Sequence, residues 1–300
     1  GLIISEATAV HPSGVGYANT PGIWSYDQIE AWKKITEAVH DKGGRIFLQL
    51  WHVGRISDPM FLNGELPVAP SAIAATGHVS LVRPHKNFVV PRALATNEIP
   101  TIVNYFRHGA QNALQAGFDG VEIHGANGYL IDQFLQDGTN KRTDQYGGSI
   151  ENRARLALEI TDAVLEVWGA DKVGYHIAPR SDSHGITDSN PLATFSYLAD
   201  ELGKRKLAFL FAREFQDHNS IGAKLKQAFG GIYIANEKFT KETAEEILRK
   251  GDADAVAFGL NFIANPDLVK RFKENAPLNQ VNFNTLYAEG STGYTDYPSL

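Results

Sequence analysis

The sequence predicts an α/β fold, a (β/α)8 TIM barrel from which we expect the first β/α unit to be missing. Seven short runs rich in Val, Ile, Leu and Phe recur along the 300 residues, and each is followed by a segment with helical periodicity. Near-continuous hydrophobic strands that alternate with amphipathic helices are typical of a parallel sheet covered on its outer side. Eight such units close a barrel, and the first run here starts almost at Gly1. The runs are Leu2–Ala7, Ile46–Trp51, Gly120–His124, Val173–Ala178, Ala208–Ala212, Ile232–Ala235 and Ala255–Gly259.

Start and stop signals place the helices between these runs. Ser25 and Gln28 have the spacing of a capping box ahead of a helix at Ile29–His40. Pro191 and Pro266 each follow an Asn and are predicted to occupy the first turn of a helix, where the missing N–H costs nothing. Further helices are predicted from Asn97 to Gly117, over Ser149–Val167, and over Thr240–Lys250 with Gly251 as the C-cap.

The chain is predicted to be one domain, residues 1–300, with one long insertion at residues 57–97. This Pro- and Ser-rich segment follows the strand that ends near Trp51, and Lys86–Pro91 within it is a candidate hairpin. Long insertions after a barrel strand lie on the face where active sites are found, so we expect a capping lid rather than a variable surface loop. A doubly wound open sheet is the alternative fold, but the sequence has no G-x-G-x-x-G phosphate loop.

Composition limits the possible partners. A net charge of −6 argues against a nucleic-acid or anionic-membrane partner. The sequence contains no run of about 18 apolar residues, so no membrane span is predicted. The absence of Cys excludes disulfides, thiolate metal sites and a Cys nucleophile. We therefore expect no metal site and a cytoplasmic protein that acts on small molecules.

Polar side chains recur where the predicted strands end. A single polar residue there would be interpreted as a rim residue whose hydrogen bonds are satisfied by its neighbours. Repetition at one end of successive strands instead indicates an active site. These residues are Gln49, Trp51 and His52 on one strand, His124 on the next, His176 and Arg180 on a third, and Arg213 on a fourth.

Two motifs connect these strand ends to a known family. Residues 121–135, VEIHGANGYLIDQFL, resemble the active-site strand and loop of the old yellow enzyme family, and residues 140–153, NKRTDQYGGSIENR, are similar to its most regular stretch. Further matches at residues 6–8, 49–55, 262–267 and 293–298 follow in the same order. The resemblance covers essentially the whole chain and is closest to bacterial alkene, N-ethylmaleimide and nitroester reductases.

The resemblance implies an FMN-dependent ene-reductase that uses NADPH or NADH as electron donor. Its substrates would be electron-poor alkenes, namely α,β-unsaturated carbonyl or nitro compounds, with nitroesters as a further class. His124 and Asn127 would donate hydrogen bonds to the activating oxygen, and Tyr129 would protonate the neighbouring carbon. The resemblance also places Gln49 at the flavin pyrimidine, Trp51 in the substrate pocket and Tyr287 near the flavin.

Three departures from the family pattern concern the flavin. His176 stands where the family has an arginine that faces the pyrimidine, and Arg180 could reach in as a substitute. Leu260 follows Gly259 where the family has an arginine on the phosphate. Backbone N–H groups around Asn236 and Gly259 would then bind the phosphate, with Arg213 or Lys238 as a nearby charge. The third departure concerns the family's first strand and helix, which supply flavin contacts and which we expect to be missing here.

These departures keep a second hypothesis open, a flavin-poor or inactive barrel that binds small carbonyl or anionic ligands. A substrate-oxidising flavin barrel of the trimethylamine dehydrogenase type is excluded, because its iron–sulfur cluster needs cysteine.

Overall fold

Among the described residues the main sheet contains eight parallel strands, seven of which form one path that follows the order of the chain. A computed structural model describes residues 1–287 and 289–300. In its sheet each strand is hydrogen-bonded to the next, and β2 (Thr8–Ala9) adds a short pairing with β3. The strands are β1 (Leu2–Ile4), β3 (Arg45–Trp51), β6 (Gly120–His124), β7 (Val173–Ile177), β8 (Phe209–Arg213), β9 (Tyr233–Asn236) and β10 (Ala255–Val256).

This strand order distinguishes the two predicted architectures. A doubly wound sheet reverses its strand order at a switch point, whereas the path from β1 through β3 to β10 follows the chain without a reversal. The winding is that of a β/α barrel, as the sequence predicts. β1 and β10 are the two ends of the order, so the sheet is not closed on itself within the described residues.

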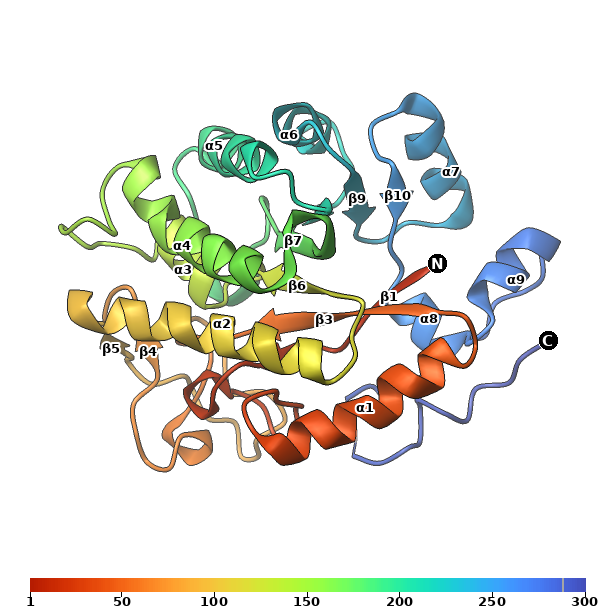
Figure 1. Ribbon diagram of the computed structural model, residues 1–300, viewed down its shortest axis with the longest axis horizontal. Coiled ribbons are helices and arrows are strands. Elements are labelled where there is room, and N and C mark those ends of the chain that lie inside the picture. The colour runs from red at the N-terminus through yellow and green to blue at the C-terminus, as the bar shows by residue number, and fades with distance from the viewer. Residues whose placement is uncertain (288) are drawn as a thin grey trace.

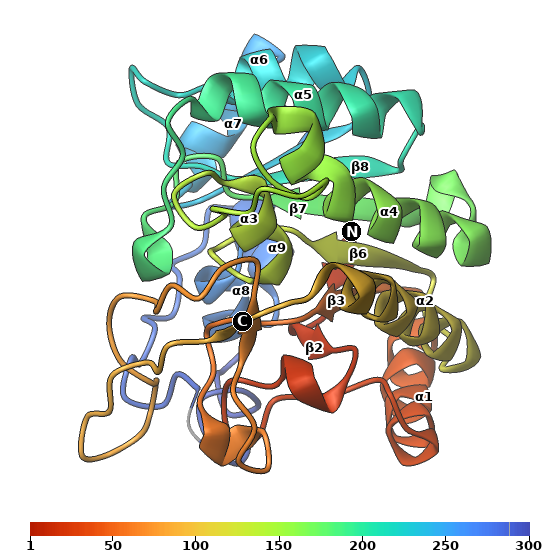
Figure 2. The same cartoon turned by 90° about the vertical axis from the view of Figure 1, so that its left-hand side faces the viewer.

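The helices lie around the outer side of the curled sheet (Figures 1 and 2). The longer ones are α1 (Tyr26–His40), α2 (Ile99–Gln115), α4 (Ile150–Trp168), α5 (Pro191–Lys204), α6 (Gly222–Phe229) and α7 (Lys241–Lys250). The short ones are α3 (Leu130–Leu135), α8 (Leu260–Ala264) and α9 (Leu268–Glu274). Within the described part of the chain, none of these helices is long and apolar enough to cross a membrane.

Most of the residues predicted to start or end helices do so in the structure. The Ser25 side chain accepts a hydrogen bond from the Gln28 backbone, which completes the capping box of α1. Pro191 starts α5, and Gly251 ends α7 in the left-handed conformation with φ 78°.

The prediction that Pro266 starts a helix is wrong, because α9 begins only at Leu268. Asn265 terminates α8 instead. Its side chain donates to the Asn261 carbonyl and accepts from the Asn279 backbone, so it cannot cap a helix at Pro266.

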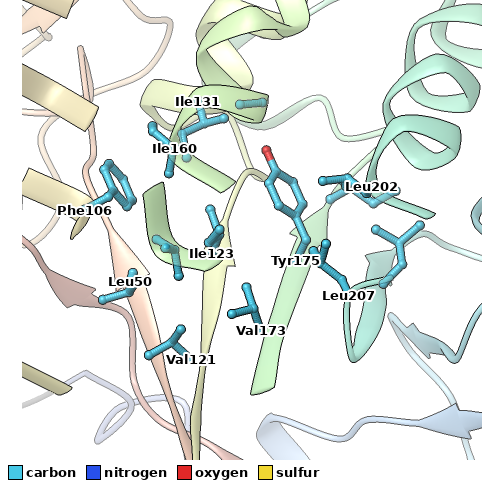
Figure 3. Close-up of a cluster of buried hydrophobic side chains, with 14 of the residues drawn as sticks. Leu50, Phe106, Val121, Ile123, Ile131, Ile160, Val173, Tyr175, Leu202 and Leu207 are labelled. Carbon is cyan, nitrogen blue, oxygen red and sulfur yellow. The ribbon is translucent and has the colours of Figure 1, made fainter. Parts of the chain in front are cut away.

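Successive residues of each strand supply two different cores. Outward side chains such as Leu50, Ile123 and Tyr175 pack between the sheet and the helices (Figure 3). Inward side chains form a smaller cluster around Phe47, Phe209, Phe211 and Ile234. The inner face of the sheet is therefore apolar near the start of the strands, and its polar residues begin at the middle of β6 with Glu122 and continue to the carboxyl ends.

The insertion at residues 57–97 packs over those carboxyl ends. Val79 and Phe88 share a buried cluster with Trp51 and the half-buried Tyr129. The Arg55 side chain, only 2 % exposed, donates to the carbonyls of Ile73 and His184 and so ties the insertion to the loop after β7.

The candidate hairpin at Lys86–Pro91 is wrong in position. The chain reverses earlier, where the Val79 N–H donates to the Lys86 carbonyl at 2.8 Å. The returning segment then forms a short parallel pair, β4 (Val68–Ala69) with β5 (Arg92–Ala93). Pro91 has no N–H to contribute to a ladder, which is consistent with this arrangement.

Candidate active site

The end of β6 and the turn that follows it bring His124, Asn127 and Tyr129 together. After His124 the chain reverses within a few residues, with Asn127 at φ 57° and Gly128 at φ 77°. Gly125 makes the turn possible, because a Cβ there would come within 2.4 Å of the Tyr175 hydroxyl. The reversal places the rings of His124 and Tyr129 5.2 Å apart, edge to face.

Burial determines the protonation of both rings. Desolvation, with a smaller contribution from the charge of Arg213, lowers the pKa of His124 to about 3, so the imidazole is neutral. Its Nδ1 accepts a hydrogen bond of 3.3 Å from the Ala126 N–H, which leaves Nε2 to carry the proton as a donor. Burial, with neighbouring tyrosines, raises the pKa of Tyr129 well above its usual value, so its phenol keeps its proton.

Tyr129 lies among aromatic rings and makes one hydroxyl contact that the sequence does not predict. Its ring is 5.0 Å from Trp51, and its hydroxyl is 2.9 Å from the hydroxyl of Tyr17. Tyr17 lies 112 residues away in the sequence, in the loop after β2, so no local pattern links the two. Both rings pack under the insertion at residues 57–97.

A second polar layer lies deeper inside the sheet, formed by Gln49, Glu122 and His176. Gln49 Nε2 donates to Glu122 Oε2 at 2.5 Å and is 3.5 Å from His176 Nδ1. Burial raises the pKa of Glu122 to about 8 and lowers the pKa of His176 well below its usual value. All three groups are therefore uncharged near neutral pH, although Glu122 begins to ionise above it.

This layer fits the ring system of a flavin. His176 Nε2 and Trp51 Nε1 are buried and lack a hydrogen-bond partner within the described residues. A buried donor without an acceptor costs about 1–3 kcal/mol, so these positions suit a ligand that brings acceptor atoms. The carbonyl and ring-nitrogen acceptors of the flavin pyrimidine are such atoms, and Gln49 lies beside His176 in this layer.

The residues predicted for the phosphate offer backbone groups rather than charge. The Asn236 side chain is engaged in a hydrogen bond within the protein, because its Nδ2 donates to the Ala257 carbonyl at 2.8 Å. A Cβ on Gly259 would meet nothing within 4 Å, so the backbone there is open to a ligand. Leu260 is 42 % exposed and places an apolar side chain beside it. Phosphate binding at this end would therefore depend on N–H groups.

Two other candidate residues, Tyr287 and Arg213, differ in their placement. Tyr287 is exposed, yet its phenol is close enough to raise the pKa values of Tyr17 and Tyr129. Arg213, at the end of β8, binds both Asn127 and Glu237. Glu237 follows β9 and carries no sequence signal that distinguishes it from a surface carboxylate.

Arg180 does not join this cluster. All its hydrogen bonds and ion pairs within the described residues are with the segment after β8: Glu214, at 2.7 Å, the Phe215 carbonyl and Asp217. Glu214 is only 2 % exposed, and its carboxylate holds the guanidinium there. The expectation that Arg180 replaces a flavin-facing arginine thus receives no support from its contacts.

Comparison with known proteins agrees with this geometry. Residues 1–279 match the family described as NADH:flavin oxidoreductase / NADH oxidase. The chain is 45% identical to 12-oxophytodienoate reductase 2 of Arabidopsis thaliana, over 100% of this chain and 83% of the relative. It is 44% identical to 12-oxophytodienoate reductase 1 of Oryza sativa subsp. japonica, over 100% of this chain and 81% of the relative.

Solved structures give the same result for the fold. Morphinone reductase superposes with a TM-score of 0.95 at 48% identity, covering 100% of this chain and 84% of that chain. An old yellow enzyme homologue from Zymomonas mobilis superposes with a TM-score of 0.97 at 44% identity, covering 100% of this chain and 86% of that one. A further morphinone reductase structure contains tetrahydroNAD and is 49% identical to this chain. The chain therefore belongs to the old yellow enzyme family of FMN-dependent NAD(P)H oxidoreductases.

Proposed function

We propose that this enzyme reduces activated C=C bonds of α,β-unsaturated carbonyl or nitro compounds, with NADH or NADPH as the electron donor. The observation that carries the proposal is the grouping of a neutral His124, the Asn127 amide and a protonated Tyr129 on one turn after β6. The relatives are reductases whose names, 12-oxophytodienoate and morphinone, denote carbonyl compounds.

Two donors would bind the activating oxygen of the substrate. His124 offers Nε2–H, since its Nδ1 accepts from the Ala126 backbone. Asn127 offers Nδ2, since its Oδ1 accepts from Arg213. As the alkene is reduced, negative charge develops on this oxygen, and donors fixed in advance stabilise it at little reorganisation cost. Neither donor carries a formal charge, so the oxygen is polarised without an ion pair in the ground state.

Tyr129 would supply the proton to the carbon next to the activating group. Its raised pKa keeps the hydroxyl protonated across the neutral range, and the Tyr17 hydroxyl at 2.9 Å holds it in place. Gln49 and His176 would hold the flavin ring beneath the substrate. When bound, FMN supplies the hydride that is delivered to the β-carbon. Nitroesters, which need no protonation at carbon, would be a further substrate class.

The insertion at residues 57–97 would act as a lid over this chemistry. Val79 and Phe88 pack against Trp51 in one buried cluster, which would exclude water above the substrate. Excluding water strengthens the hydrogen bonds from His124 and Asn127, because the local dielectric falls.

An anaerobic redox cycle tests the proposed function. The protein is first titrated with FMN, and saturable quenching of flavin fluorescence is expected. The flavin band should then be bleached by NADH or NADPH and restored by one equivalent of a cyclic enone, with the saturated ketone as the product. A protein that binds the saturated ketone but no flavin would instead be a carbonyl-binding barrel.

A further inference from the structure

Within the described residues, Arg213 is the strand-end arginine whose contacts reach the oxygen-binding pair, His124 and Asn127. Its Nη1 donates to Asn127 Oδ1 at 3.0 Å, and its Nε donates to Glu237 Oε2 at 2.6 Å. The side chain thus joins the turn after β6 to the loop after β9, across the end of β8. The charge of Arg213 also affects His124 and Tyr129. It lowers the pKa of His124 in the same direction as burial, and it lowers the pKa of Tyr129 against the larger, opposite effect of burial.

Both partners of Arg213 lie on backbone with a positive φ, which asparagine adopts more readily than glutamate. Asn127 has φ 57° and Glu237 has φ 107°, both in the left-handed region that favours glycine. Conformations of this kind cost about 1–3 kcal/mol and persist where surrounding contacts over-determine them. Both ends of the Arg213 bridge are therefore fixed in the backbone as well as by hydrogen bonds.

The contact with Asn127 decides which way its amide points. A carboxamide has an oxygen that accepts and a nitrogen that donates, whereas a guanidinium only donates. The atom that faces Arg213 must therefore be Oδ1, and Nδ2 must face away from it. This is the only hydrogen bond of the Asn127 side chain within the described residues. Without it, a half-turn of the amide would present Oδ1 to the substrate oxygen and replace attraction by repulsion.

His124 is oriented by the same principle with a different partner. The Ala126 N–H can only donate, so it fixes Nδ1 as the acceptor and Nε2 as the free donor. One of the two oxygen-binding groups is thus oriented by the backbone of its own turn. The other depends on a side chain from β8.

We propose that Arg213 is a positioning residue that fixes the amide of Asn127 as a hydrogen-bond donor to the substrate oxygen, with Glu237 as its anchor. The inference rests on the proposed function, because it concerns how that same oxygen is bound. Arg213 itself touches neither the substrate nor the reacting carbons. Its effect should therefore pass entirely through Asn127.

A double-mutant cycle tests that dependence. Arg213→Met keeps the length of the side chain and removes its donors, and Asn127→Ala removes the amide that it orients. Loss of one oxyanion donor typically costs ~10²–10³ in rate, so Arg213→Met should lower kcat/KM for a cyclic enone, per bound flavin, by at least about tenfold. In the Asn127→Ala background the same change should cause no further loss. Arg213→Lys, which can still donate to Oδ1, should recover part of the activity.

A binding measurement supplies a readout that does not depend on turnover. The saturated ketone accepts the same hydrogen bonds but cannot be reduced, and its Kd can be measured by calorimetry. Arg213→Met should weaken ketone binding when Asn127 is present and leave it unchanged when residue 127 is alanine. Arg205→Met is the matched control, because Arg205 is also an ion-paired arginine but binds Asp162 on the outer helices.

The outcomes separate the two levels of the proposal. If the wild-type protein neither reduces enones nor binds the ketone, the proposed function fails. Alternatively, the wild-type protein reduces enones and binds the ketone, while Arg213→Met changes neither kcat/KM nor Kd, or changes them equally in the Asn127→Ala background. In that case only the positioning role fails. Should Arg213→Met not fold, Glu237→Gln gives the same cycle, since it retains Arg213 and weakens its anchor. Its smaller loss should also vanish in the Asn127→Ala background.

Discussion

Replacing Tyr129 by phenylalanine separates the two half-reactions that one pocket is proposed to perform. The change keeps the ring and its edge-to-face contacts with Trp51 and His124 and removes only the hydroxyl. That hydroxyl makes one side-chain hydrogen bond, with Tyr17, so the expected loss of stability is about 0.5–1.5 kcal/mol. A positioned general acid contributes roughly 10²–10⁴ in rate. The chemical effect should therefore greatly exceed the structural one.

Stopped-flow absorbance measures each half-reaction on the Tyr129→Phe enzyme. Bleaching of the flavin by NAD(P)H needs no proton from residue 129 and should stay near the wild-type rate. Recovery of the flavin band with an enone should slow by the ~10²–10⁴ of a lost general acid. Tyr17→Phe is the matched control, since it removes the same hydrogen bond but leaves the Tyr129 proton in place, and it should cost far less. Unchanged recovery in Tyr129→Phe would refute the assignment of Tyr129 as the acid.

Three further predictions concern the hydrogen-bond donor His124, the buried carboxyl group of Glu122 and the core between the sheet and the helices. His124→Ala should lower enone reduction by ~10²–10³ while flavin content, read from the absorbance of the purified protein, stays near that of the wild type; parallel loss of both would show that His124 is structural. Glu122 has a folded-state pKa of about 8 against 4.5 when unperturbed, so the folded protein holds a proton that the unfolded chain loses. The free energy of unfolding contributed by Glu122 should thus fall between about pH 5 and 8, by about 1.4 kcal/mol per pH unit at most, and Glu122→Gln should remove this slope. Urea unfolding of both proteins at pH 4.5 and 7.5 checks this; a constant difference between them would contradict it. Ile160 is fully buried between α4 and the sheet, so Ile160→Ala should cost about 2–5 kcal/mol and Ile160→Val about 0.5–1.5, measured by the same unfolding curves. Equal effects of the two substitutions would argue against close packing there.

Most of the strands could be predicted because they are largely apolar runs with clear ends. Two predicted runs were too long: only Leu2–Ile4 of Leu2–Ala7 and only Ala255–Val256 of Ala255–Gly259 form strands, because polar residues or glycine interrupt the rest. Gly120–His124 has the predicted bounds in the structure, since Asp119 before it and Gly125 after it stop the run. Two-residue strands such as Val68–Ala69 show no periodicity, so their pairing inside the insertion could not be predicted. Pro266 shows the limit of a local rule, because a neighbouring Asn serves a different helix end.

The site was predictable where it is local. His124, Asn127 and Tyr129 lie within one turn, so recognition of the motif located all three. Tyr17 and Glu237 reach the site only through the folding of distant segments, and nothing in their own surroundings marks them. Arg180 illustrates the opposite error, since spacing places it near His176 but Glu214 binds it instead.

Isotope tracing of the reduced product tests the central claim most directly. A cyclic enone is reduced by the FMN-loaded enzyme with nicotinamide deuterated at its transferable position, in ordinary water, and then with ordinary nicotinamide in D2O. Proton magnetic resonance of the saturated ketone locates the label in each case. We predict nicotinamide deuterium on the β-carbon and solvent deuterium on the carbon next to the carbonyl, where Tyr129 is proposed to deliver a proton. Nicotinamide deuterium on the carbonyl carbon, with an alcohol as the product, would contradict the account.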